Sequence, residues 1–565
     1  MDSTGPLNRP AWNWPTLRPR WMAEYRASWW RADFVAGMTL AAYAIPVSLA
    51  YAELAGLPPQ VGVYGYLLGG IGYALLGSSR QLAVGPTSAI SLMIAGTVGA
   101  MADGDAQRYA QIASLTAFTV AALCLFAWAL RLSALVKLIS DSILVGFKAG
   151  AALTIAMSQL PSLFGLAGGG HNFFERALLL LGQLGNTHYL VLVLGILAII
   201  LLVLGERLLP GRPVALGVVA LSILIVSLFG LSKLGVPTTG EIPAGLPALK
   251  GPALRLRDVE GILPLAAGCL LLAYIESVSA ARTLAEKHGY LVDSRQELLG
   301  IGAANLATAL GQGYPVAGGL SQSAVNDKAG ARTPLALVFA SITLALCLVF
   351  LTGLLENLPK AVLAAVVVTA VYGLLDFPAL FRMWRVSRLD FYAAAVALIG
   401  VLLLGILHGI LLAALTSVLL LLARASQPHV AFLGRVPGTN SYSDLARHPE
   451  NETIPGVIAF RPEASLLYIN ADAVKQAVLH RLGAASASDI RLMVCDLSAS
   501  PYLDLAGARM LHDLHGELAA RAIALRIVGA RGRVRDLLRA DGMDQKVGGL
   551  DRATTLESLV SRGCN

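Results

Sequence analysis

Long apolar stretches separated by short polar turns occupy most of the chain. Examples are the stretches from Tyr189 to Leu204 and from Phe391 to Leu407. A helix needs about 20 mostly apolar residues to cross the hydrocarbon core of a bilayer, and many of these stretches approach that length. The pattern predicts about fourteen membrane segments, at residues 33–52, 60–77, 86–100, 108–130, 134–160, 187–207, 212–231, 259–281, 296–311, 319–330, 334–353, 358–375, 389–405 and 408–424.

Two of these segments, 86–100 and 319–330, are too short to cross about 30 Å of hydrocarbon at about 1.5 Å per residue. Each follows a break rich in glycine and proline, Val84-Gly85-Pro86 in the first case and Gly313-Tyr314-Pro315 in the second. The two also occupy matching places in two halves of the membrane region, which indicates a transport site built from inverted repeats. Helix N-termini that face each other in mid-membrane form an anion site without a formal charge. The alternative is that both segments are structural breaks without a ligand.

Loops that are rich in lysine and arginine alternate along the chain with loops that contain few of them. If residues 1–32 form a cytoplasmic N-terminal arm, about twenty positive charges fall in the inside loops and about seven in the outside loops. A register slipped by one segment would destroy this alternation. The rule therefore predicts that both the N-terminal arm and the region after the last segment are cytoplasmic.

The pattern of apolar and polar residues changes after the membrane region, which we place at residues 33–425. Strand-like runs at 457–460, 466–470, 491–497 and 523–528 alternate with helical patterns at 471–482, 505–521 and 531–541. Strands alternating with helices indicate a compact α/β domain. We expect this domain to comprise residues 426–565.

Composition supports the membrane interpretation and excludes several classes of function. Hydrophobic residues make up 56% and charged residues 14% of the 565 residues, whereas about a quarter of the residues in a soluble protein are charged. The net charge of +8 is spread over many loops, which argues against a nucleic-acid partner. The sequence has no Gly-Lys dipeptide, hence no Walker A loop, and no nucleophile–base pattern or metal-ligand spacing. We therefore expect neither an enzyme nor a bound cofactor or metal.

Several motifs follow one another through the membrane region. They are Ala50-Tyr51-Ala52-Glu53-Leu54-Ala55-Gly56-Leu57-Pro58-Pro59, Leu76-Gly77-Ser78-Ser79-Arg80, Gly240-Glu241-Ile242-Pro243, Arg295-Gln296-Glu297-Leu298, Gly313-Tyr314-Pro315-Val316 and Ser321-Gln322-Ser323-Ala324-Val325-Asn326. In these residues and in their order the chain resembles the sulfate permease (SulP) family of anion transporters, as a bacterial-type member. The C-terminal region resembles the STAS domain of that family in Cys495-Asp496-Leu497-Ser498 and Asp504-Leu505-Ala506-Gly507.

The resemblance implies an α-helical membrane protein with two inverted repeats of seven segments, divided into a core and a gate domain, and a C-terminal STAS domain. It also implies a multi-pass protein of the bacterial inner membrane, a homodimer, and alternating access. Family substrates include sulfate, bicarbonate and C4-dicarboxylates, and some members are coupled to protons or sodium. We expect proton-coupled symport of a small anion. The alternatives are an anion channel or exchanger on the same scaffold and a nucleobase permease with the same repeats.

The resemblance places the substrate between the two short segments and beside the first membrane segment, 33–52. Two positions depart from the family pattern: Val47 stands where many members have glutamine, and Gln322 where many have arginine. Glutamine carries no permanent charge, so we expect room for a larger anion or a co-transported cation. The expected binding residues, which contribute mainly backbone N–H groups at the helix starts, are Val47, Tyr51, Thr87, Ser88, Gly319, Leu320, Ser321 and Gln322.

Glu276 is a lone carboxyl group in the middle of segment 259–281. Ionisable groups at this depth usually face the interior of the bundle or a wet cavity, and a carboxyl group partly removed from water retains its proton more readily. We expect Glu276 to couple proton movement to transport, with a structural hydrogen bond as the alternative. Asp141 and Lys148 lie on one face of segment 134–160, where we expect a structural polar seam rather than a transport role.

Overall fold

The structure is a computed structural model that describes residues 20–132, 140–170, 172–209, 212–484 and 490–563. It separates into two compact units that divide between Ser417 and Val418, inside a long helix. Most of the expected N-terminal arm, residues 1–19, and the start of the expected segment 134–160, residues 134–139, lie outside the described residues.

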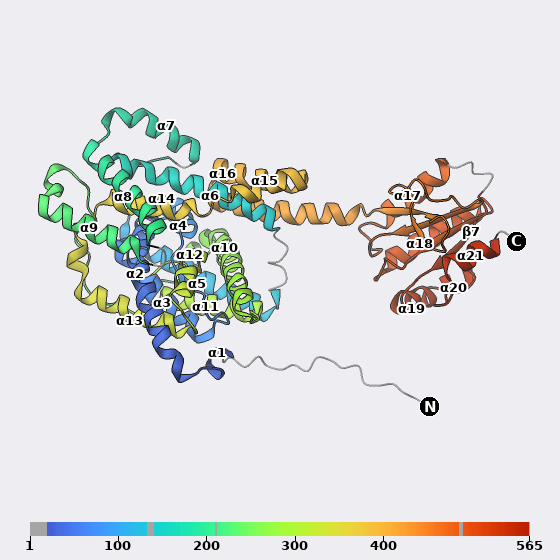
Figure 1. The fold of residues 1–565 in the computed structure, drawn as a ribbon, viewed down its shortest axis with the longest axis horizontal. Coiled ribbons are helices and arrows are strands. Elements are labelled where there is room, and N and C mark those ends of the chain that lie inside the picture. The colour runs from blue at the N-terminus through green and yellow to red at the C-terminus, as the bar shows by residue number, and fades with distance from the viewer. Residues whose placement is uncertain (1–19, 133–139, 171, 210–211, 485–489, 564–565) are drawn as a thin grey trace. The chain divides into compact units, whose positions relative to one another are not determined.

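Each predicted membrane segment corresponds to a helix (Figure 1), and the helix of the last segment contains the boundary between the two units. The last two segments form one helix, α16, with a break at Gly405, where φ is 83° and ψ is 172°. In the described residues, seven helical stretches are long and apolar enough to cross a membrane, and α4, α9 and α13 are shorter apolar helices. The helices are α2 (Trp30–Leu54), α3 (Pro59–Leu76), α4 (Ser88–Ala102), α5 (Ala106–Ala129), α6 (Asp141–Phe164), α8 (Tyr189–Leu208), α9 (Val214–Phe229), α10 (Leu256–His288), α11 (Ser294–Leu310), α12 (Leu320–Lys328), α13 (Leu335–Phe350), α14 (Lys360–Tyr372) and α16 (Arg388–Ser426).

Three helices of the first unit were not predicted: α1 (Arg20–Ala23), α7 (Phe173–Gln183) and α15 (Phe377–Val386). All are short, and α7 and α15 carry charged residues among their apolar ones. A search for continuous apolar runs passes over such helices, because their apolar residues occupy one face only.

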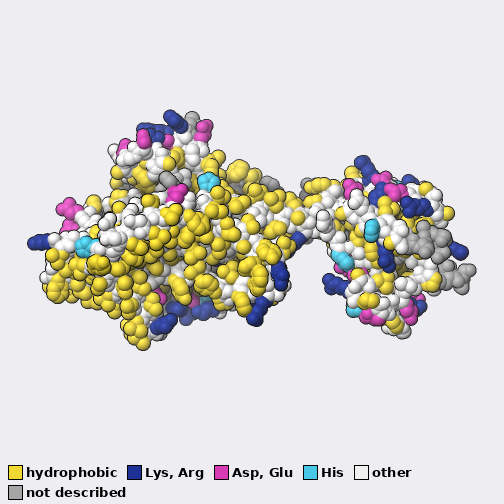
Figure 2. All heavy atoms as spheres, turned by 90° about the horizontal axis from the view of Figure 1, so that it is seen from above, with side chains coloured by type: hydrophobic (Ala, Val, Ile, Leu, Met, Phe, Trp, Pro, Cys, Tyr) yellow, Lys and Arg dark blue, Asp and Glu magenta, His cyan; other side chains and the backbone are white. Residues whose placement is uncertain are grey.

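The outer surface of the first unit is apolar. Figure 2 shows a broad belt of hydrophobic side chains on this unit, with charged side chains gathered at its two margins. On α8, for example, Val193 and Ile200 are exposed by 60% and 52%. A surface of this kind is unfavourable in water but matches the hydrocarbon core of a bilayer.

The helices of the first unit pack in two groups. Helices α2, α3, α5, α11 and α13 pack against one another and, through α5, against α4 and α10, whereas α6, α8 and α14 form a second set of mutual contacts. Helix α16 joins the second set, because Gly146 and Gly150 of α6 lie directly against Ala394 and Leu398 of α16. The two groups correspond to the division into core and gate domains that the resemblance implies.

Two very short strands link the repeats in mid-bundle. Strand β1 (Val84–Gly85) pairs antiparallel with β2 (Ala317–Gly318). Ser323 Oγ accepts a hydrogen bond from the Ala83 N–H at 2.9 Å, and Ser277 Oγ accepts one from the Gly318 N–H at 2.8 Å. These bonds satisfy backbone groups that hydrocarbon would leave without partners, so the glycine-rich breaks have a fixed geometry.

A buried carboxylate joins α3 to α11. Glu297 accepts hydrogen bonds from the Tyr73 hydroxyl at 2.9 Å, from the Ser78 hydroxyl at 2.6 Å, and from the N–H groups of Ser78 and Ser79 at 3.0 and 3.1 Å. Its side chain is fully buried. This cluster ends α3 and fixes the start of α11.

We expect Glu297→Ala to lower the free energy of unfolding by about 3 kcal/mol or more, because it leaves several buried donors without an acceptor. Thermal unfolding of the purified protein, monitored by size-exclusion chromatography after heating, measures the effect. Glu286→Ala removes an exposed carboxylate from α10 and is the matched control. Equal melting temperatures for the two variants would contradict this role for Glu297.

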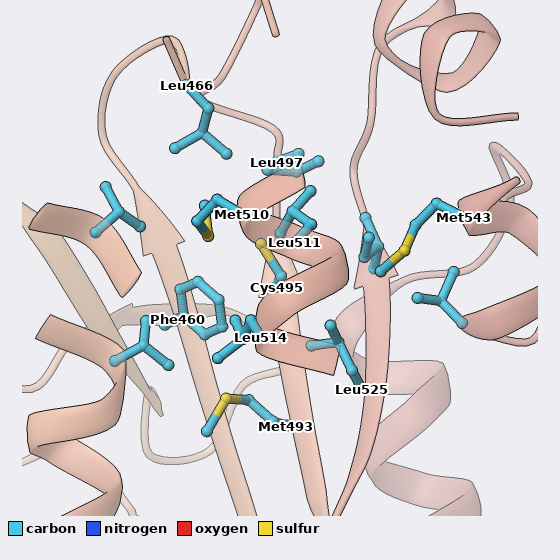
Figure 3. Packing of buried hydrophobic residues seen from close by; sticks show 14 of the residues in the cluster. Phe460, Leu466, Met493, Cys495, Leu497, Met510, Leu511, Leu514, Leu525 and Met543 are labelled. Carbon is cyan, nitrogen blue, oxygen red and sulfur yellow. The ribbon is translucent and has the colours of Figure 1, made fainter. Parts of the chain in front are cut away.

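The second unit is a five-stranded sheet flanked by helices. The strand order is β4-β3-β5-β6-β7, in which β5, β6 and β7 run parallel and β3 is antiparallel to both of its neighbours. One face packs Phe460, Cys495, Leu511 and Leu514 into the larger core (Figure 3). The elements are β3 (Val430–Arg435), β4 (Tyr442–Asp444), β5 (Val457–Pro462), α17 (Ala471–Ala484), β6 (Leu492–Asp496), α18 (Leu505–Ala519), β7 (Ala524–Val528), α19 (Gly532–Ala540), α20 (Met543–Lys546) and α21 (Leu556–Gly563).

The predicted strand at 466–470 is wrong. Leu466 makes only an isolated bridge with Leu503, and the chain then turns. Side chains satisfy the N–H groups of this turn: Asn470 accepts from Leu467 at 3.0 Å and Asp504 accepts from Tyr468 at 2.8 Å. Side-chain acceptors of this kind compete with strand pairing. Strands β3 and β4 were missed, because β3 follows the last apolar helix closely and β4 is very short.

Candidate functional site

A cavity of about 230 Å³ lies where the N-termini of α4 and α12 meet α2, α6, α10 and the end of α14. All of the binding residues expected from the sequence line it, together with Glu276. The structure therefore brings together Val47, Tyr51, Thr87, Ser88, Glu276, Gly319, Leu320, Ser321 and Gln322 around one space.

The two short helices begin at this cavity. Thr87 is the N-cap of α4 and Gly319 that of α12, and neither caps its helix through a side chain. The first main-chain bonds back to these caps come from Ser91, at 2.9 Å, and Ser323, at 3.0 Å. The preceding N–H groups of each first turn have no acceptor within their helix. Both positive helix ends are thus directed at the same space.

Thr87 lines the cavity and carries a buried hydroxyl group. The residue is only 8% exposed, and its Oγ1 forms no hydrogen bond to any part of the chain that the structure describes. A buried hydroxyl without a partner is costly. The start of α4 therefore carries a donor that no described group uses.

Gln322 is held by the backbone of both repeats. Its Nε2 donates to the Ala83 carbonyl at 3.1 Å and to the Ala317 carbonyl at 3.2 Å, and the residue is 4% exposed. Its amide nitrogen therefore stabilises the crossing of the two strands rather than reaching into the cavity. In contrast, Ser321 is exposed to the cavity.

Helix α2 lines the cavity beside the two helix ends. Val47 and Tyr51 are 2% and 8% exposed, and the Tyr51 hydroxyl interacts with the Ser88 side chain. Val47 supplies an apolar contact where a glutamine would supply hydrogen bonds. Tyr43, one turn earlier on the same helix, also lines the cavity and was missed.

The sequence analysis also missed Lys148 as a cavity residue. Lys148 of α6 lines the same cavity as Glu276 of α10. Asp141 lies at the start of α6 and lines a different cavity with Arg282 and Glu286. The structure therefore places Asp141 and Lys148 beside two different cavities, each with charged residues of α10. Helical periodicity within α6 gave no sign that Lys148 faces a carboxylate on another helix.

A second cavity adjoins this one. It has a volume of about 370 Å³, shares Tyr43, Val47 and Ser321 with the first cavity and extends to Arg212 and Lys328. We call this space the inner cavity and the first one the central cavity. Arg212 lies between α8 and α9, and Lys328 is the last residue of α12.

Comparisons with known proteins give a consistent result. The model of the sulfate permease family matches residues 30–397, and that of the STAS domain matches residues 448–558. A "Probable sulfate transporter" of Mycobacterium tuberculosis is 34% identical over 525 residues, which cover 93% of this chain and 94% of the relative. "Sulfate transporter 4.1, chloroplastic" of Arabidopsis thaliana is 30% identical over 553 residues, covering 94% and 80%.

Solved structures share the fold. The murine Solute Carrier 26 family member A9 anion transporter in the inward-facing state has a TM-score of 0.88 at 21% identity, covering 100% of this chain and 97% of that one. The transmembrane domain of a cyanobacterial bicarbonate transporter has a TM-score of 0.61 at 21% identity, covering 70% and 98%. The predicted fold, a helical membrane protein with a C-terminal STAS domain, is confirmed.

Proposed function

The chain belongs to the sulfate permease family of anion transporters, and from this premise we propose that it is a secondary transporter that holds a small anion between the N-termini of α4 and α12. It is a multi-pass membrane protein and not an enzyme. The observation that carries the proposal is the convergence of two helix ends on one cavity.

Sulfate is the substrate that we propose first, because the two relatives described above are named as sulfate transporters. Bicarbonate and C4-dicarboxylates remain candidates. The positive field comes from the two helix ends and from Lys148, since Gln322 adds no permanent charge. Without the two parallel donors of an arginine guanidinium group, the site does not select for one planar oxyanion geometry. It therefore suits more than one small anion.

Coupling to protons follows from the charges around the cavity. Lys148 from α6 faces Glu276 from α10, while Asp376 before α15 lines the rim and already caps α15 through Ala379. When Glu276 is ionised, it offsets the charge of Lys148. When Glu276 is protonated, the ammonium group is available to the anion. Proton and anion therefore bind cooperatively, which is the requirement for symport.

Alternating access then moves the two helix groups relative to each other. Helices α4, α10 and α12 carry the helix ends and Glu276, whereas α6 and α14 form the opposite wall with Lys148 and Ala370. We propose that the inner cavity opens to the cytoplasm, that the N-terminus and the STAS domain lie there, and that the protein is a homodimer in the bacterial inner membrane.

Reconstitution in liposomes tests this function. We expect saturable uptake of labelled sulfate that a proton gradient accelerates and that competing anions inhibit, with bicarbonate, chloride and fumarate as the panel. Non-saturable flux that follows the membrane potential alone would instead indicate a channel on the same scaffold. Uptake of nucleobases without uptake of any anion would overturn the proposal.

A further inference from the structure

A separate cavity of about 360 Å³ lies in the membrane unit and shares no lining residue with the central cavity. It is bordered by Glu53, just after Tyr51 on α2, and by Leu92 and Ala95, about one and about two helical turns after Ser88 on α4. The inner cavity lies in the opposite direction along α2, beside Tyr43 and Val47. We call this separate space the outer cavity.

The outer cavity contains two basic side chains and one acidic side chain. Lys360 at the start of α14 forms an ion pair with Glu53, with Nζ 2.8 Å from Oε1. Arg176 of α7 is the second basic residue, and no ion pair joins it to any described carboxylate. One positive charge therefore remains without an opposite charge inside the cavity.

The guanidinium group of Arg176 is incompletely satisfied. Its Nε donates to the Gly170 carbonyl at 3.1 Å, whereas its buried Nη1 has no hydrogen-bond partner in the described part of the chain. Burial lowers the pKa of the Arg176 guanidinium, and the neighbouring Glu175 carboxylate opposes this change. A charged donor that is removed from water and left without an acceptor is costly. The guanidinium group that lines the cavity therefore has donor capacity that no described group uses.

The rest of the wall is mixed. Gly168, Gly169 and Gly170 line it as a loop without side chains, and Gly170 has a φ of 88°. Ser158 and Ser162 of α6 add hydroxyl groups, of which that of Ser158 donates to the Ile155 carbonyl at 2.6 Å. Apolar contacts come from Leu54, Leu92, Met157 and Pro161. Two cations beside such groups attract small oxyanions and halides and repel a cationic ligand.

We propose that the outer cavity is a second anion-binding site, in which Arg176 and Lys360 hold an anion that is entering or leaving the central cavity from the side opposite the inner cavity. The inference relies on the proposed function only for the identity of the ligand as a small anion. Binding there would also compete with Glu53 for Lys360. Because Glu53 belongs to α2 and Lys360 to α14, an anion in this site loosens an ion pair between the two helix groups.

Equilibrium binding of radiolabelled sulfate to the full-length protein in nanodiscs tests the proposal. We expect two binding components in the wild type, one lost in Ser321→Asp and the other weakened at least about tenfold in Arg176→Gln, since a charge-assisted pair is lost. Arg176→Lys keeps the charge and should bind within about tenfold of the wild type. Lys233→Gln removes a cation from an exposed site outside the cavity and should change neither component.

The outcomes separate the two proposals. A single component that Ser321→Asp removes and Arg176→Gln leaves unchanged overturns the second site and leaves the proposed function intact. A single component that only Arg176→Gln removes supports the outer cavity and overturns the central site. Absence of any binding in the wild type overturns both. If Arg176→Gln does not fold, Lys360→Gln replaces it, and unchanged binding in a folded Lys360→Gln contradicts the proposal.

Discussion

Replacing Ser321 by aspartate is expected to abolish anion binding in the central cavity while the protein remains folded. Ser321 is exposed in the first turn of α12, and this turn faces the first turn of α4 across the cavity. An aspartate there places a tethered negative charge where the two helix ends attract an anion. At a separation of about 5 Å and an effective dielectric constant of about 20, two like charges repel by about 3 kcal/mol, which is more than a hundredfold in affinity.

The same position distinguishes the helix ends from the side chain as the source of binding. Ser321→Ala removes at most one hydrogen bond, about 1 kcal/mol, and should weaken binding only about fivefold. Aspartate in the first turn also favours the helix itself, so a loss of binding should not be accompanied by a loss of stability.

Binding of labelled sulfate and thermal unfolding, measured on the same purified samples, provide the test. Ser232→Asp introduces the same charge at an exposed position away from the cavity and serves as the control. If Ser321→Asp binds and transports sulfate as the wild type does, the anion does not sit between these helix ends.

The sequence was sufficient for the positions of the two short helices because the signals there are local. A Gly-Pro break precedes Ser88, a glycine-rich break precedes Leu320, and a run of apolar residues too short to span follows each. Backbone chemistry of this kind acts within a few residues, so a single sequence reveals it. The match to known family motifs added Val47 and Tyr51, which physical reasoning from composition alone does not identify.

Contacts between helices distant in sequence were the part that could not be predicted. Nothing near Lys148 in the sequence indicates that it faces Glu276, because the two residues lie on different helices. The same limit applies to Gln322, whose side-chain nitrogen binds the carbonyl of Ala83 in the other repeat. Arg176 was missed as well, since it belongs to a short helix that no membrane pattern marks. These roles arise only when the repeats fold against each other.

Glu276→Gln is expected to remove the acceleration of uptake by external acid while leaving a folded protein that still binds the anion. Glutamine has nearly the size and shape of the protonated glutamic acid but cannot release a proton. The variant therefore resembles the protonated state permanently, and Lys148 is no longer offset by a carboxylate at any pH. Anion affinity should become independent of pH, at a value close to that of the wild type in acid.

The expected sign distinguishes coupling from a structural role. If Glu276 carries the proton, wild-type affinity for sulfate falls as pH rises, because the ionised carboxylate competes with the anion for Lys148, and Glu276→Gln abolishes this fall. A structural hydrogen bond would instead make Glu276→Gln less stable without altering the pH profile of the protein that remains folded.

Sulfate binding and liposome uptake, measured between about pH 5 and about pH 8, distinguish the two roles, because protonation changes are readily followed in this range. Glu286→Gln changes an exposed carboxylate of the same helix α10 and should keep the wild-type profile. A pH dependence in Glu276→Gln equal to that of the wild type would show that another group carries the proton, and the exposed carboxylate of Asp376 at the rim of the cavity would then be the next residue to replace.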